Sequence, residues 1–181
     1  MVRYFAYGSV LSMRHVGEWA AEHGVDAQLF ARGAPAVLRG HRLVFDVESR
    51  FWGGKAADLT DDPAGVVHGV VFELPDSAQE SVLRKEGVPT GLSMQLSVTV
   101  EVAGKPVQAI AFVARPERRT APGPASSRLL AYLIEGAKER GLPAAWVEEL
   151  ERSAAPVPTS GPARTPPSLA VLQLKKPRSQ A

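Results

Sequence analysis

The alternation of hydrophobic and polar residues predicts a chain that mixes strands and helices. Strands are expected where β-forming residues alternate or run together, and helices where apolar residues recur every three or four positions. The predicted strands cover 2–7, 41–47, 65–74, 92–102 and 107–114, and the predicted helices cover 12–23, 78–86, 126–140 and 144–152. Hairpins alternate with helices in this order, which predicts an α+β fold with flanking helices. Its sheet is small, mixed or antiparallel, and able to curl into a barrel.

Individual residues mark the ends of several elements. Ser12 is placed to cap the first helix, and Gly24 is placed to end it. Ser77 and Glu80 have the spacing of a capping box for the second helix. Residues 48–64, around Phe51-Trp52-Gly53-Gly54, are polar and predict a loop.

A change in composition near Ser153 divides the chain into a body, 1–152, and a proline-rich basic tail, 153–181. The tail is predicted to be mostly irregular, with Leu169–Leu174 as one short strand that docks on the body. Of the 21 basic residues, four lie in the tail, which leaves 17 in the body against all 19 acidic residues. A body without basic excess argues against a nucleic-acid surface. The tail could bind RNA or anionic lipid weakly, and a solvated end is the simpler interpretation.

Several kinds of site and location lack support in the sequence. There is no cysteine, which excludes thiol nucleophiles and zinc–thiolate sites and agrees with a reducing compartment. No apolar run approaches the roughly 20 residues that span a bilayer, and no signal-peptide pattern opens the chain. We therefore expect a cytoplasmic protein without a membrane partner. No metal site is expected either, because the histidines have no metal-ligand spacing: His15, His23, His41 and His68.

Two segments remain as candidates for chemistry. One is the transition from strand to loop, where a glycine lets the backbone approach a ligand and free N–H groups could bind an anion. Its residues are Tyr4, Phe5, Ala6, Tyr7, Gly8, Ser9 and Val10. The other is Glu86, a carboxylate at a helix C-terminus, where the helix dipole disfavours it. An ordinary turn and an exposed surface glutamate beside Arg84 and Lys85 are the alternatives.

Four short motifs in a fixed order resemble the γ-glutamylcyclotransferase family. They are Tyr7-Gly8-Ser9, Val67–Phe72, Glu86-Gly87-Val88 and Gly136–Pro143, and the resemblance covers roughly residues 3–152. It implies a small β-barrel domain with flanking helices that releases 5-oxoproline from a small γ-glutamyl amide, without metal or cofactor. It also implies Glu86 as the general acid and base, and the Tyr4–Val10 segment as the substrate-binding loop.

The chain departs from the family pattern at three positions. Val10 stands where an asparagine is usual, Ser93 stands near an aromatic position, and a second tyrosine position falls at Leu129, with Tyr132 one turn on. These changes leave the acid/base in place and alter the pocket wall. Two interpretations therefore stay open: a cyclotransferase for some γ-glutamyl amine, or a catalytically silent binding or partner module of the same fold. No oligomeric state follows from the sequence.

Overall fold

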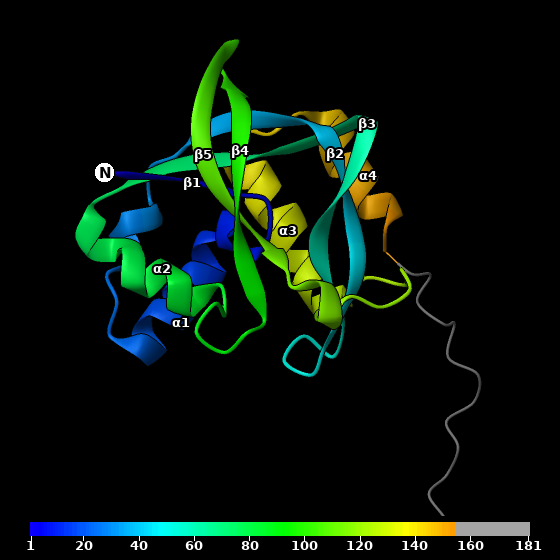
Figure 1. The fold of residues 1–181 in the computed structure, drawn as a ribbon, viewed down its shortest axis with the longest axis horizontal. Coiled ribbons are helices and arrows are strands. Elements are labelled where there is room, and N and C mark those ends of the chain that lie inside the picture. The colour runs from blue at the N-terminus through cyan, green and yellow to red at the C-terminus, as the bar shows by residue number, and fades with distance from the viewer. Residues whose placement is uncertain (155–181) are drawn as a thin grey trace, which may run out of the picture.

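The computed structural model describes residues 1–154, which form a closed five-stranded barrel with helices around it (Figure 1). Neighbouring strands are antiparallel, except that β1 and β5 are parallel and meet at Tyr4 and Ile110. The α+β barrel with a mixed sheet, predicted from the sequence, is confirmed. Nearly all of the predicted tail, including Leu169–Leu174, lies outside the described residues. The barrel order is β1-β3-β2-β4-β5, with β1 at Val2–Ala6, β2 at Ala34–Ser49, β3 at Gly54–Leu74, β4 at Ser93–Val102 and β5 at Lys105–Ala114.

In the described part of the chain, four α-helices lie outside the barrel: α1 (Met13–His23), α2 (Gln79–Lys85), α3 (Ser127–Glu139) and α4 (Ala144–Arg152). The Ser12 side chain accepts a hydrogen bond from the N–H of His15, and Gly24 ends α1 in the left-handed conformation with φ 64°. Both predicted caps of α1 are therefore confirmed. None of the helices within residues 1–154 is long and apolar enough to cross a membrane.

The capping box predicted at Ser77 and Glu80 is wrong. The chain first makes a 3₁₀ turn, Asp76–Ala78, and α2 begins only after it, without a side-chain cap. Ser77 is therefore inside a turn when the helix starts. Glu80 instead pairs with Arg84 one turn on, at 2.8 Å between Oε1 and Nη2.

The loop predicted over 48–64 is also wrong, because only residues 50–53 join β2 to β3. The acidic residues of this stretch fit within β3 because each has a cross-strand or buried partner. Asp61 and Asp62 lie 3.5 Å and 3.7 Å from nitrogen atoms of His41 and Arg42 on β2. Asp58 is buried and accepts a hydrogen bond from the N–H of Ala114. It also pairs with Arg119, which lies in the segment after β5.

The segment between β1 and α1 is held in place by α3. Gly136 packs directly on the backbone of this segment, and a Cβ atom there would lie 2.4 Å from the carbonyl carbon of Leu11. The Arg140 guanidinium donates hydrogen bonds to the carbonyls of Leu11, Phe30 and Ala31 at 2.7–3.0 Å. The family-like motif near the end of the body therefore fixes the position of the loop that follows β1.

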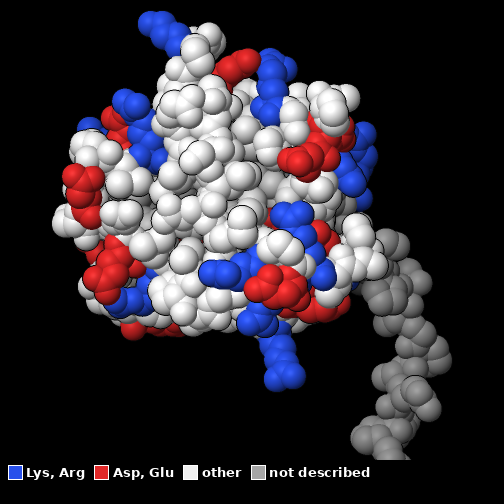
Figure 2. Space-filling model, in the orientation of Figure 1, with Lys and Arg blue, Asp and Glu red and all other residues white. Residues whose placement is uncertain are grey.

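Charge on the molecular surface is mixed in sign. On the face in Figure 2, basic and acidic side chains lie next to one another around an uncharged centre. That face gives no extended basic surface of the kind that binds a phosphate backbone.

The close packing at Gly136 predicts that Gly136→Ala destabilises the protein by about 1–3 kcal/mol, since a backbone segment must shift to admit the methyl group. The free energy of unfolding in urea measures this effect. Gly17→Ala is the matched control, because Gly17 lies within α1 and a Cβ there has nothing within 4 Å. We expect that change to stabilise the protein by up to about 1 kcal/mol. Equal effects of the two substitutions would contradict the packing argument.

Candidate active site

A cavity of about 490 Å³ is lined by the end of β1, the face of α1, the end of α2 and the β2–β3 turn. Both candidate segments from the sequence reach it. Glu86 lines it, and so do Tyr4, Tyr7, Gly8, Ser9 and Val10. Phe5 and Ala6 are fully buried in the core, so their part in substrate binding stays a prediction.

Glu86 follows the last residue of α2 and is held at both its backbone and its carboxylate. Its N–H donates to the carbonyl of Val82 at 2.9 Å, and its own carbonyl accepts a hydrogen bond from the Ser93 hydroxyl. Gly87 then turns the chain with φ 72°. The Tyr4 hydroxyl donates to Glu86 Oε1 at 2.8 Å. Within residues 1–154, Glu86 Oε2 accepts no hydrogen bond, which leaves this oxygen available to a ligand.

The surroundings of Glu86 raise its proton affinity. Burial raises the pKa of Glu86, and the Lys85 ammonium and the Tyr4 hydrogen bond oppose this shift in part. The pKa of Tyr4 lies well above its ordinary value because of burial and the nearby Glu86 carboxylate, so its hydroxyl remains a donor. The Tyr4 ring is fixed by Phe72 and Phe112, with ring centroids 6.2 Å and 5.4 Å away. The site thus holds a carboxyl group suited to both accept and return a proton.

The loop after β1 presents free backbone donors on the same cavity. Residues Ser9–Leu11 form a 3₁₀ turn, closed by bonds from the N–H groups of Leu11 and Ser12 to the carbonyls of Gly8 and Ser9. In the described part of the chain, the N–H groups of Gly8, Ser9 and Val10 have no protein acceptor. Three successive free donors can bind a carboxylate or a developing oxyanion.

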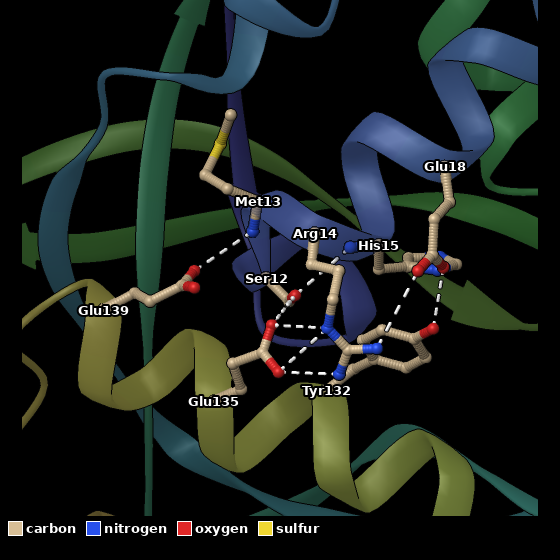
Figure 3. Close-up of polar contacts among 8 residues, drawn as sticks. All are labelled: Ser12, Met13, Arg14, His15, Glu18, Tyr132, Glu135 and Glu139. Carbon is tan, nitrogen blue, oxygen red and sulfur yellow. Dashed lines mark hydrogen bonds and ion pairs between the residues drawn. The ribbon is translucent and has the colours of Figure 1, made fainter.

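A polar network between α1 and α3 keeps this loop in place (Figure 3). Glu135 of α3 accepts hydrogen bonds from the Ser12 hydroxyl at 2.9 Å and from the Arg14 guanidinium at 2.6 Å. The Tyr132 hydroxyl donates to Glu18 Oε2 at 2.7 Å. The start of α1, and with it the end of the loop, is therefore tied to α3 by side chains from both helices.

Several cavity residues were not found by sequence reasoning. His15, Trp19 and His23 line the cavity from one face of α1. Their spacing of four residues was the available signal, since such residues lie one above another on a helix. Trp52, Lys85 and Leu92 also line the cavity.

The positions that depart from the family pattern lie at this cavity or beside it. Val10, Ser93 and Leu129 line it, whereas the Tyr132 hydroxyl is engaged by Glu18. Among residues 1–154, no three histidine, aspartate or glutamate side chains are grouped so that they could hold a metal ion.

Comparisons with known proteins agree on one relationship. The profile described as the AIG2-like family matches residues 66–150. Human γ-glutamylcyclotransferase is 29% identical over 153 residues, which cover 82% of this chain and 76% of the human protein. A solved γ-glutamyl cyclotransferase superposes with a TM-score of 0.71 at 26% identity, covering 88% of this chain and 91% of that structure. YkqA from Bacillus subtilis superposes with a TM-score of 0.72 at 25% identity, over 83% of this chain and 53% of YkqA.

The hydrogen bond between Tyr4 and Glu86 predicts that Tyr4→Phe raises the pKa of Glu86, because the bond stabilises the carboxylate form. A pH titration of the Glu86 carboxyl carbon by NMR measures the shift. Tyr132→Phe is the matched control, since it removes an equivalent tyrosine–glutamate bond at Glu18. A Glu86 pKa that moves equally in both variants, or falls in Tyr4→Phe, would contradict this assignment.

Proposed function

The chain is a distant member of the AIG2-like, or γ-glutamylcyclotransferase, family, and on this premise we propose that it is a cofactor-free γ-glutamylcyclotransferase. Its substrate is a small γ-glutamyl amide, and its products are 5-oxoproline and a free amine. Glu86 is the general acid and base, and the loop from Tyr4 to Val10 binds the glutamyl group.

The reaction depends mainly on holding the substrate in its reactive conformation, because it requires no second reactant. The α-amino nitrogen of the substrate attacks its own γ-carbonyl carbon, so nucleophile and electrophile belong to one molecule. Glu86 takes a proton from the attacking amine as the new C–N bond forms. It then returns the proton to the leaving nitrogen as the original amide C–N bond breaks. The free N–H groups of the loop stabilise the oxyanion or bind the substrate carboxylate.

One observation supports this proposal above the others: a carboxyl group with a raised pKa lies on the cavity wall with one oxygen unengaged. Glu86 Oε1 is held by Tyr4, which orients the group, while Oε2 remains available to the substrate. An exposed glutamate would have the ordinary pKa and would exchange protons with water instead. The alternative of a surface glutamate, which the sequence left open, does not explain these contacts.

A catalytically silent binding module is the second candidate. Val10 supports it, because an apolar side chain lines the cavity where the family pattern has an amide. Under this alternative the cavity binds a γ-glutamyl compound and releases no product.

The proposed role of Glu86 predicts that Glu86→Gln lowers 5-oxoproline release about 100- to 10,000-fold, the usual range for a lost general acid/base. The assay compares γ-glutamyl-alanine, γ-glutamyl-ε-lysine, glutathione and a γ-glutamyl alkylamine. Glu80→Gln is the control, because it removes an exposed carboxylate from the same helix.

An unchanged rate in Glu86→Gln would exclude Glu86 as the acid/base. A substrate-dependent rise in melting temperature without product would support the silent module instead.

We also propose that the body alone carries the function. A chain that ends at Ala154 keeps every cavity-lining residue of the described part of the chain, and these lie between Tyr4 and Leu129. We expect its kcat/KM to remain within about twofold of the full chain, because differences under about 0.4 kcal/mol lie within the range of surface changes. Loss of activity on truncation, with the melting temperature retained, would assign part of the site to residues 155–181.

A further inference from the structure

Within residues 1–154, the ammonium group of Lys85 lies on the cavity without a carboxylate at ion-pair distance. Lys85 is half-buried, lines the cavity beside Glu86, and has its Nζ 2.9 Å from His15 Nε2 and 5.5 Å from the centre of the Trp19 ring. Among the described residues no carboxylate lies within 4.0 Å of Lys85 Nζ. Burial lowers the pKa of Lys85, and the Glu86 carboxylate opposes this shift in part. An anionic ligand in contact with Lys85 would stabilise its charged form further.

His15 is a neutral partner that orients this ammonium. It is only 4% exposed, and its pKa is lowered to about 3 by burial and by the surrounding cations Lys85, Arg128 and Arg14. The neutral ring accepts a hydrogen bond from Lys85 at Nε2, so its own hydrogen is on Nδ1, a buried atom without a protein partner in residues 1–154. Lys85 thus keeps further N–H hydrogens for a ligand.

The position of His15 is well determined. Its ring packs between Trp52 and Tyr132, at centroid distances of 5.1 Å and 4.9 Å. Its backbone N–H is bound by Ser12, which belongs to the network between α1 and α3 in Figure 3. The pair formed by Lys85 and His15 is therefore preorganised on the cavity wall.

Under the proposed function, Lys85 is left for the part of the substrate beyond the glutamyl group. In that proposal the free N–H groups of the loop bind the glutamyl carboxylate or the oxyanion, and Glu86 acts at the scissile amide. Lys85 directly precedes Glu86, and the rings of Trp19 and Trp52 line the same cavity. The cavity volume of about 490 Å³ falls in the range of pockets that bind drug-sized small molecules. The leaving amine would therefore extend towards an ammonium group and two indole rings.

We infer that Lys85, oriented by His15, binds an acid group on the leaving amine, and that this amine carries an aromatic side chain that packs on Trp52. The inference rests on the proposed function and names its substrate class: γ-glutamyl conjugates of aromatic amino acids. A carboxylate would receive charge-assisted hydrogen bonds from Lys85. A cationic leaving amine would meet Lys85 and Arg84, both on the cavity wall, and would be disfavoured.

Four substrates with the same scissile amide test the inference: γ-glutamyl-phenylalanine, γ-glutamyl-alanine and the carboxamide of each. In the wild-type protein we expect kcat/KM for each acid to exceed that for its carboxamide by about 10- to 100-fold, the range of a hydrogen bond to a charged group. The phenylalanine acid should exceed the alanine acid by about tenfold, as expected for an added aromatic contact.

Two variants separate the two contacts. Lys85→Met should bring the ratio of acid to carboxamide close to one and keep the preference for phenylalanine. Trp52→Leu should remove the preference for phenylalanine. Because Trp52 also packs on His15, this change should lower the ratio of acid to carboxamide in part and leave it above one. Because Lys85 also lowers the pKa of Glu86, Lys85→Met can change all four rates together, and the ratio is unaffected by such a common change. Lys138→Met, at an exposed lysine of α3, should leave both ratios as in the wild type.

Each outcome bears on a separate statement. Turnover of acids and carboxamides at equal kcat/KM in the wild-type protein would overturn the role of Lys85 and leave the proposed function standing. Equal kcat/KM for the two acids would overturn the aromatic substrate class. Absence of 5-oxoproline from all four substrates would overturn the proposed function, and the inference with it.

Discussion

The hydrogen bond from Tyr4 to Glu86 connects the closure of the barrel to the chemistry of the cavity. Tyr4 lies on β1, where that strand meets β5 and closes the sheet, and its ring is buried against Phe72 and Phe112. The hydroxyl therefore has a fixed position, from which it holds one oxygen of a carboxylate 82 positions further along the chain. Burial raises the pKa of Glu86, and this bond limits the increase. Proton affinity and orientation at the site both depend on this contact.

Contacts between helices α1 and α3 position the other residues that line the cavity. Gly136 and Arg140 hold the segment before α1 by close packing and by three hydrogen bonds. Glu135 holds Ser12, which in turn binds the N–H of His15. One helix therefore positions both the free N–H groups of the loop and the imidazole that orients Lys85. Under the proposed function, a change on α3 would affect glutamyl binding and leaving-group binding together.

Local signals in the sequence were sufficient to predict the boundaries of elements whose ends depend on nearby residues. The caps at Ser12 and Gly24 are examples, because each is satisfied within one turn of its own helix. The start of β3 was missed because Asp58, Asp61 and Asp62 are compatible with a strand only through partners elsewhere in the sequence. Local polarity alone predicts a loop for such a segment.

The candidate site, like the fold, contains residues that the sequence identified and residues that it missed. Glu86 and the loop after β1 were identified by resemblance to a family, since the residue pattern alone favoured an ordinary turn and a surface glutamate. Lys85 was assigned to the surface because its partner, His15, lies 70 positions away on another helix. Contacts of this kind arise only when the barrel brings α1 and α2 together, and no short-range pattern encodes them.

In the proposed function, this cavity catalyses an intramolecular cyclisation with Glu86 as the acid/base. Mass spectrometry tests this directly on the products formed from γ-glutamyl-phenylalanine in water that carries a heavy oxygen isotope. We expect 5-oxoproline without heavy oxygen, formed by the wild-type protein and not by Glu86→Gln, because no water molecule enters the products. Glutamate that carries the heavy isotope would show hydrolysis instead and would exclude cyclisation as the reaction.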